Sequence, residues 1–279
     1  MALSVAFSPD GAIFAAGTSE GTVFLQRLTE DKPLFTWSNH AGAVRRVAFQ
    51  PHGRQFASAG EDGHIALYDL DAPERAPMML SGHANAVGAL AFNADGTLLA
   101  SGGEDGVINI WMTANGRKQL TLQDATAQSL AWHPQKPLLI AGLDTGMIAV
   151  WNVSDGALEQ RFQAHAEFVT AVDISPDGTM LLSGGGKTLK LWTFPDAAAV
   201  ATFEGHAEAV YAALFTGERA EFVSGGRDKT VRAWKMQTTP TTFAAADDIA
   251  AFGCKWIHGF LQADSSLDYD EQRRICREQ

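Results

Sequence analysis

A short block of alternating apolar residues recurs six times along the chain. The copies are GTVFLQRL (21–28), GHIALYDL (63–70), GVINIWMT (106–113), GMIAVWNV (146–153), TLKLWTF (188–194) and TVRAWKM (230–236). One aromatic position recurs in them, at Gln26, Tyr68, Trp111, Trp151, Trp192 and Trp234, with spacings of 42, 43, 40, 41 and 42 residues. A period of this length is typical of propeller blades or of solenoid units.

The runs inside each copy favour propeller blades. The second copy contains AVRRVAF, QFASAG and HIALYDL, all of which alternate with the twofold period of a strand. Asp-Gly pairs such as Asp62-Gly63 and Asp105-Gly106 separate the second run from the third, and they tolerate the positive φ that tight hairpins require. A fourth run, such as KQLTL, completes each unit. The sequence therefore predicts an all-β fold, a β-propeller of four-stranded antiparallel blades with six clear blades and a degenerate seventh.

The pattern divides the chain into residues 1–246, which hold the six blades, and residues 247–279, where it decays. The second part is either a degenerate seventh blade or a C-terminal tail that closes the ring, and we favour the blade because 249–270 can be laid out as three strands. The chain starts directly on a first strand, LSVAF, so no spare N-terminal strand is expected to complete the last blade. That edge would then be covered by the C-terminal segment RRICREQ or by a partner chain, or it would stay open.

Polar residues recur with the same period. Gly-His precedes the first strand, Ser-Gly lies in the second, and a tryptophan ends the third, a pattern that resembles the WD-repeat family over residues 3–236. The resemblance implies that the histidine, the serine, the turn aspartate and the tryptophan form a hydrogen-bonded cluster inside each blade, because buried polar groups must pair with one another. The residues assigned to these clusters are His40, Ser58, Asp62, His83, Ser101, Asp105, Trp111, Asp144, Trp151, His165, Ser183, Trp192, His206, Ser224, Asp228 and Trp234.

Several copies depart from the pattern. Tyr68 replaces the tryptophan in the second copy. In the fourth, Gln123 or Asp124 stands where the histidine is expected, and Ala141 replaces the serine. The first copy has neither the serine nor the aspartate, so we expect no cluster there.

The stretch Gly186-Lys187-Thr188 resembles the end of a phosphate-binding loop. Such a loop needs a glycine five positions earlier, where this chain has Leu181, and a helix afterwards, whereas TLKLW alternates as a strand. Against SGGRDKTVRAW of the sixth copy, the fifth copy lacks the turn aspartate. We therefore predict a hairpin turn, with one hydrogen-bond partner fewer for His165 and Ser183.

The titratable residues predict no catalytic, cofactor or metal site. Four histidines belong to separate blades and cannot share a metal, and the other four, expected to be exposed, are His52, His64, His133 and His258. The recurring pairs Glu61-Asp62 and Glu104-Asp105 each commit one carboxylate to a cluster, so they do not provide two carboxylates converging on one substrate.

The charge and the cysteines bear on partners and location. A net charge of −11 argues against nucleic acid as a partner, since phosphates are bound by clustered Lys and Arg. The chain has no run of about 18 apolar residues and no secretory signal at its start, so we expect neither a membrane span nor export. Cys254 and Cys276 are expected to be free thiols, and the predicted location is cytoplasmic.

The resemblance also implies a binding surface, the face that carries the second-to-third strand turns and the loops before each first strand. The candidate partner-binding residues on it are Arg45, Glu61, Glu104, Phe168, Tyr211 and Arg227. Tyrosine and arginine are enriched at binding hot spots. We therefore expect a non-enzymatic scaffold or adaptor with a protein or peptide partner, as a subunit of a complex. The alternatives are a propeller enzyme of the hydrolase or lactonase type, with its site at the channel mouth, and an architectural subunit whose open edge another chain completes.

Overall fold

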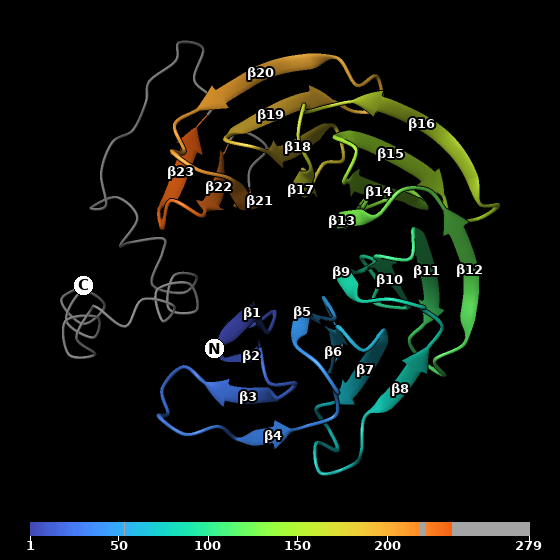
Figure 1. Cartoon of the computed structure of the whole chain (residues 1–279), viewed down its shortest axis with the longest axis vertical. Coiled ribbons are helices and arrows are strands. Elements are labelled where there is room, and N and C mark those ends of the chain that lie inside the picture. Colours follow the sequence, from blue (N-terminus) through green and yellow to red (C-terminus); the bar gives the residue numbers. More distant parts are fainter. Residues whose placement is uncertain (53, 218–220, 236–279) are drawn as a thin grey trace.

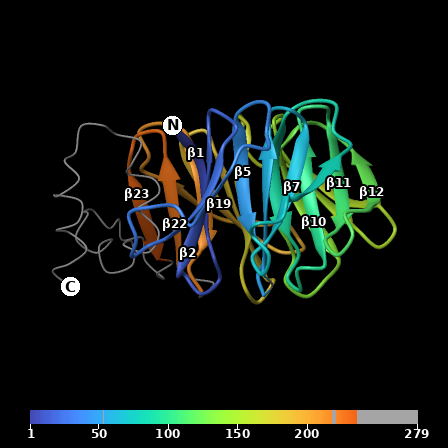
Figure 2. The ribbon, with the colours of Figure 1, turned by 90° about the horizontal axis from the view of Figure 1, so that it is seen from below.

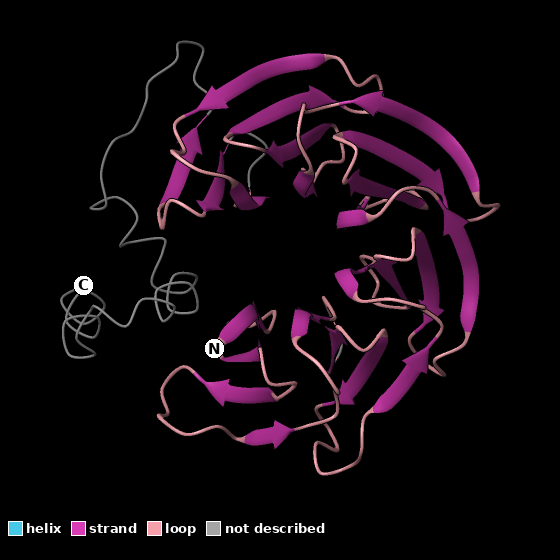
Figure 3. Ribbon diagram, in the orientation of Figure 1, coloured by secondary structure: helices cyan, strands magenta, loops and turns pink. Residues whose placement is uncertain are grey.

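The structure is a computed structural model that describes residues 1–52, 54–217 and 221–235. In these ranges every regular element is a strand (Figure 3), so they contain no helix that could cross a membrane. The 23 strands form six antiparallel sheets arranged around a central axis (Figure 1). Each sheet is one blade, and its strands follow chain order from the innermost outwards.

The first three blades are built from β1 to β12. Blade one holds β1 (Ala2–Phe7), β2 (Ile13–Thr18), β3 (Val23–Arg27) and β4 (Phe35–Trp37). Blade two holds β5 (Val44–Phe49), β6 (Gln55–Gly60), β7 (His64–Asp69) and β8 (Met78–Ser81). Blade three holds β9 (Val87–Phe92), β10 (Leu98–Gly103), β11 (Val107–Met112) and β12 (Lys118–Gln123).

The remaining blades are built from β13 to β23. Blade four holds β13 (Ala127–Trp132), β14 (Leu138–Leu143), β15 (Met147–Asn152) and β16 (Ala157–Gln163). Blade five holds β17 (Val169–Ile174), β18 (Met180–Gly185), β19 (Thr188–Thr193) and β20 (Ala199–Glu204). Blade six has three strands within the described residues, β21 (Val210–Phe215), β22 (Glu221–Gly226) and β23 (Val231–Lys235).

The predicted propeller of six blades is confirmed, and the predicted hairpins are the ones observed. Several predictions lie outside the described residues: the boundary between 246 and 247, the seventh blade, the two cysteines and His258.

The hydrophobic core lies between blades. Each innermost strand packs against the next one around the axis, from β1 to β21 (Figure 1). Val44 of β5, for example, belongs to one apolar cluster with Ala15, Val23 and Leu25 of blade one. Since a single blade cannot bury its apolar faces alone, its stability depends on its neighbours.

Hydrogen bonds also join neighbouring innermost strands. Arg46 Nε of blade two donates to the Gly88 carbonyl of blade three at 2.9 Å. Thr170 Oγ1 of blade five donates to the Val210 carbonyl of blade six at 2.6 Å. These bonds fix the height of each blade against the next, and therefore the positions of the loops that the strands carry.

Asp173 on β17 is an acidic residue at the junction of blades five and six. Its Oδ2 accepts a hydrogen bond from the Phe215 N–H of β21 at 2.8 Å. Burial raises the pKa of Asp173 to about 7, although the Phe215 hydrogen bond acts in the opposite direction. The folded protein therefore holds a proton on Asp173 at pH values where the unfolded chain, with an ordinary aspartate pKa near 4, has lost it.

We predict that Asp173 makes the protein less stable as the pH rises from about 4 to about 7. Asp173→Asn keeps an oxygen for the Phe215 N–H and removes the ionisation, so the variant should gain stability over the parent across that interval, on the order of 1 kcal/mol or more at pH 8. Urea unfolding of both proteins at pH 5 and pH 8 measures this. A stability difference between the two proteins that is the same at both pH values would contradict the assignment.

Candidate functional site

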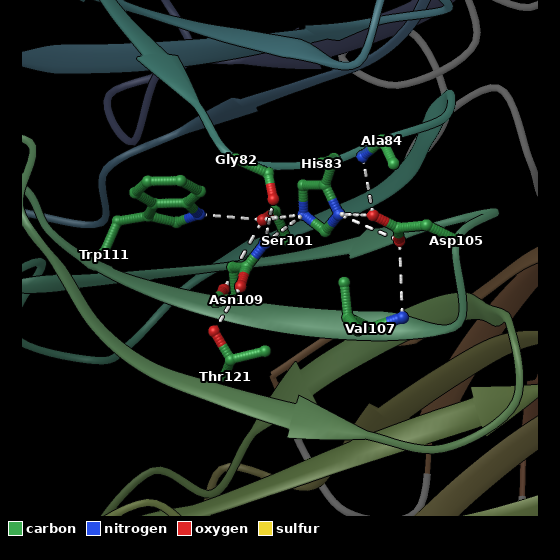
Figure 4. Close-up of polar contacts among 9 residues, drawn as sticks. All are labelled: Gly82, His83, Ala84, Ser101, Asp105, Val107, Asn109, Trp111 and Thr121. Carbon is green, nitrogen blue, oxygen red and sulfur yellow. Dashed lines mark hydrogen bonds and ion pairs between the residues drawn. The ribbon is translucent and has the colours of Figure 1, made fainter.

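Blade three contains a buried polar cluster that joins four of its segments (Figure 4). Trp111 Nε1 on β11 donates to Ser101 Oγ on β10 at 2.8 Å. Ser101 Oγ lies 2.8 Å from His83 Nε2, and His83 Nδ1 lies 3.1 Å from the carboxylate of Asp105 in the β10–β11 turn. All three bonds are satisfied when the hydroxyl donates to Nε2 and Nδ1–H donates to the aspartate.

The charges of this cluster are set by burial and by its hydrogen bonds. Burial lowers the pKa of His83, while Asp105 acts to raise it, and the net shift is downwards. Burial alone would raise the pKa of Asp105, but hydrogen bonds from the Ala84 N–H and from His83 outweigh it and lower that pKa. A Cβ on Gly103 would collide with both His83 Nδ1 and Asp105 Oδ1, which explains why glycine ends β10.

Blade two repeats this arrangement with a tyrosine. His40 Nε2 lies 2.7 Å from Ser58 Oγ, and its Nδ1 lies 3.1 Å from Asp62. The hydroxyl of Tyr68 lies 3.1 Å from Ser58 Oγ and so takes the place of the indole N–H. The ring of Tyr68 stacks on Phe56, with 4.3 Å between the centroids.

Blade six has the complete set. His206 bonds Asp228 at 2.9 Å and Ser224 at 2.7 Å, and Trp234 Nε1 donates to Ser224 Oγ at 2.8 Å. Burial would raise the pKa of Asp228, but hydrogen bonds from Thr230, Ala207 and His206 lower it to about 2.

Blade five lacks the turn aspartate, as predicted, and Thr188 partly replaces it. His165 Nε2 and Trp192 Nε1 both bond Ser183 Oγ, at 2.8 and 2.9 Å. At the other ring nitrogen, Thr188 Oγ1 lies 3.3 Å from His165 Nδ1, a longer contact and an uncharged one. Burial, together with the Lys190 charge, lowers the pKa of His165 to about 4. Gly186 and Lys187 form the tight turn between β18 and β19, so the predicted hairpin is confirmed and no phosphate loop exists there.

Blade four does not form the cluster. Gln123 ends β12 with its side chain exposed, whereas the Asp124 side chain is only 4% exposed and pairs with Arg161 at 3.0 Å. Ala141 offers no hydroxyl, and within the described residues Trp151 Nε1 has no hydrogen-bond partner. The prediction that Asp144 and Trp151 belong to a hydrogen-bonded cluster was therefore wrong. Without the histidine and the serine, no described residue connects the two side chains.

His133 corrects a further expectation. It was expected at the surface but is only 4% exposed. Its Nδ1 accepts hydrogen bonds from the Gln135 and Lys136 N–H groups at 3.1 Å, so it caps the turn after β13. The prediction failed because His133 lies in a turn, where exposure is usual, but its side chain folds back onto that turn.

The face that carries these loops has a repeated backbone device. Each innermost strand has a β-bulge at its second residue, as in β5, where Val44 opposes Gly60 and Arg46 opposes Ala59. The six extra residues are Leu3, Arg45, Gly88, Gln128, Thr170 and Tyr211. Bulges of this kind re-aim side chains and often lie beside functional sites. We call these six residues the bulge ring; it lies at the start of the innermost strands, on the upper face in Figure 2, where the N-terminus lies.

The face that carries the bulge ring exposes three large hydrophobic side chains. Leu3 and Tyr211 are 41% and 46% exposed, and Phe168, directly before β17, is 55% exposed. Of the bulge ring, only Arg45 and Tyr211 were among the candidates predicted from the sequence. Leu3 and Gln128 were missed because no histidine precedes the first strand in their copies to mark the position.

The charged candidates all form ion pairs on this face. Arg45 bonds Glu61 at 2.7 Å and reaches Glu104 of blade three at 3.4 Å, so the three form one exposed network across two blades. Arg227 lies 3.5 Å from Glu208. Exposed pairs of this kind contribute little to stability.

Comparison with known proteins identifies the repeat. The family model for the WD domain, G-beta repeat matches residues 2–25, 31–69, 76–112, 156–193 and 198–235, more than half of the chain. The chain belongs to the WD-repeat family. The matched segments leave out β13 to β15 of blade four, the blade that has lost its polar cluster.

Individual relatives match over short segments. This WD-repeat chain is 37% identical to cytoplasmic dynein 2 intermediate chain 2 of Homo sapiens over 98 residues, which cover 29% of the chain and 18% of the relative. It is 38% identical over 60 residues to DDB1- and CUL4-associated factor 13 of Dictyostelium discoideum, covering 22% of the chain and 14% of the relative. The chain thus spans less than a fifth of these relatives.

The fold has a close counterpart among solved structures. A chain in a crystal structure of a mitotic checkpoint complex superposes with a TM-score of 0.78 at 24% identity, over 84% of this WD-repeat chain and 74% of that chain. At this identity the likeness shows the propeller fold alone.

The weakened cluster of blade five predicts faster local opening than in blade three. Amide protons around Ser183 should be less protected from exchange than those around Ser101, because Thr188 contributes one long contact where Asp105 contributes a charged hydrogen bond. His165 has a folded pKa of about 4, below that of an unfolded histidine, so protection at Ser183 should fall further as the pH drops from about 6.5 towards 4. Amide exchange resolved by residue checks both statements, and equal protection at the two serines would contradict them.

Proposed function

We propose that this protein is a non-enzymatic scaffold that binds a protein or peptide partner on the face carrying the bulge ring. The observation that carries the proposal is the presence of three exposed large side chains at that face: Leu3 and Tyr211 on innermost strands, and Phe168 in the loop directly before β17. Rigid frameworks with short loops are the common way in which binding residues are positioned. Aromatic residues that are exposed without a partner are the side chains that anchor interfaces.

The relatives support a role in protein assemblies. One is named as a factor associated with DDB1 and CUL4, another as a dynein intermediate chain, and the solved structure belongs to a checkpoint complex. WD-repeat propellers thus occur as subunits of complexes, and we extend this role to the present chain as an adaptor.

The electrostatics of the face favour a partner whose contact surface is mainly apolar, with positive charge at its rim. Arg45 and Arg227 are already paired with glutamates, so they do not present free positive charge. The network of Arg45, Glu61 and Glu104 carries a net charge of about −1, and the whole chain carries −11. An acidic surface steers basic partners and repels nucleic acid.

Enzymatic activity would need side chains that converge on one substrate. Within the described ranges no three histidine, cysteine or acidic side chains are grouped so that they could hold a metal ion. The histidines of blades two, three, five and six are committed to hydrogen bonds inside their own blades. We therefore propose binding rather than catalysis, and a cytoplasmic location stays a prediction.

We predict that substitutions on this face abolish partner capture. Arg45→Ala, Phe168→Ala, Tyr211→Ala and Arg227→Ala combined in one variant should weaken binding at least about tenfold, because hot-spot anchors each contribute more than 1 kcal/mol. Tagged wild type and variant are compared by affinity capture from native extract, with mass spectrometry of the proteins that co-elute.

The matched control is Leu158→Ala with Val200→Ala. These residues are 43% and 46% exposed but lie on the outer strands β16 and β20. The control should retain the partner, and thermal unfolding of all variants should stay close to wild type. Full retention of the partner by the fourfold variant would exclude this face.

A further inference from the structure

Blade four has lost the two groups that connect the indole to the turn aspartate in its neighbours. In blade three the chain of hydrogen bonds from Trp111 to Asp105 passes through the Ser101 hydroxyl and then the His83 imidazole. In blade four Ala141 stands at the serine position, and no histidine precedes β13. Trp151 and Asp144, the two residues at the ends of this series of hydrogen bonds, are still present in blade four.

Three buried polar atoms in and beside blade four have no partner among the described residues. Trp151 Nε1, Asp144 Oδ1 and Asp124 Oδ2 are buried without a hydrogen-bond partner in the described part of the chain. Trp151 and Asp144 belong to blade four, and Asp124, in the loop before β13, pairs with Arg161 of the same blade. Only one other such atom, Arg232 Nε, occurs in the described part, in blade six. Each buried polar group left without a partner costs about 1–3 kcal/mol, so three in and beside one blade need a physical explanation.

The interior of blade four is both polar and bounded by small side chains. Ala141 and Ala149 are fully buried. At the position of Ala149 blade three has Asn109, which reaches His83 Nε2 at 3.1 Å, and blade five has Lys190. Alanine at both positions leaves the side chains of Asp124, Asp144 and Trp151 without the groups that fill the other blades.

The missing partner must donate to carboxylate oxygens and accept from an indole N–H. Asp124 Oδ1 is already satisfied by Arg161 Nη2 at 3.0 Å and by the Ala125 N–H at 2.8 Å, so the open requirement concerns Oδ2. A bare cation cannot accept the N–H of Trp151, and the guanidinium of Arg161 on Asp124 disfavours a second positive charge. Water both donates and accepts, and buried waters in proteins typically make about three such bonds.

We propose that the interior of blade four binds two ordered water molecules in place of the serine hydroxyl and the histidine imidazole. The first accepts the Trp151 Nε1–H, as Ser101 Oγ accepts that of Trp111. The second donates one O–H to Asp144 Oδ1, as His83 donates to Asp105. It donates its other O–H to Asp124 Oδ2. The two waters thereby replace the hydrogen bonds that the serine and the histidine make between the indole and the aspartate in blade three.

A high-resolution crystal structure of the wild type and of Ala141→Ser tests the site directly. In the wild type, ordered solvent should lie within hydrogen-bond distance, about 2.7–3.2 Å, of Trp151 Nε1 and of Asp144 Oδ1. In Ala141→Ser the new hydroxyl should displace the first water and leave the second. Trp151 Nε1 bonded directly to a protein acceptor, or an interior without ordered solvent, would overturn the proposal.

A pair of matched variants tests the same bond by stability. Trp151→Phe and Trp111→Phe remove the same ring volume from buried positions in neighbouring blades. If water satisfies Trp151, both substitutions also remove one hydrogen bond, and their effects on the unfolding equilibrium constant should agree within about threefold. If the indole N–H is unsatisfied, Trp151→Phe removes a penalty and should be at least about tenfold less disruptive than Trp111→Phe, which would overturn the proposal.

Discussion

The imidazole that joins a serine to an aspartate is the interaction that positions the loops and turns of one face. In blades two, three and six it connects the loop before the first strand to the second strand and to the following turn, with bonds of 2.7–3.1 Å. The serine then links this unit to the third strand through Tyr68, Trp111 or Trp234. The imidazole thus fixes the loop and the turn of one face in a single geometry. The exposed residues of that face and the bulge ring are therefore carried on segments whose positions the core determines.

The blades differ in how completely they use this interaction, and the differences have local physical effects. Blade five keeps the imidazole and the serine but loses the carboxylate, and with it the partner that would stabilise a protonated His165. Blade four loses the imidazole and the serine, and the remaining carboxylate and indole keep atoms that no residue in the described part of the chain satisfies. The propeller tolerates both, because each blade is also held by apolar packing and hydrogen bonds to its neighbours.

The period of about 42 residues was enough to predict the strands, the hairpins and the blade order, because the propeller repeats one local unit. The clusters of blades two, three and six followed from residue identity alone. Three features did not follow. Thr188 contacts the imidazole that an aspartate contacts in other blades, although it lies on the third strand and not in the turn before it. His133 folds back onto its own turn, and Asp124 is buried through its pair with Arg161. Each depends on side-chain direction or on a contact between strands, which spacing does not encode. The bulge ring was found only in part, because a bulge is a property of register between two strands.

The central claim is that the core clusters position one face for partner binding. Amide exchange of the protein alone and in complex with its captured partner tests this most directly. The account predicts added protection in the segments after each cluster histidine, 41–46, 84–89, 166–171 and 207–212, and at the start of β1. Protection confined to the outer strands β8, β12, β16 and β20, or to the turns of the opposite face, would contradict it.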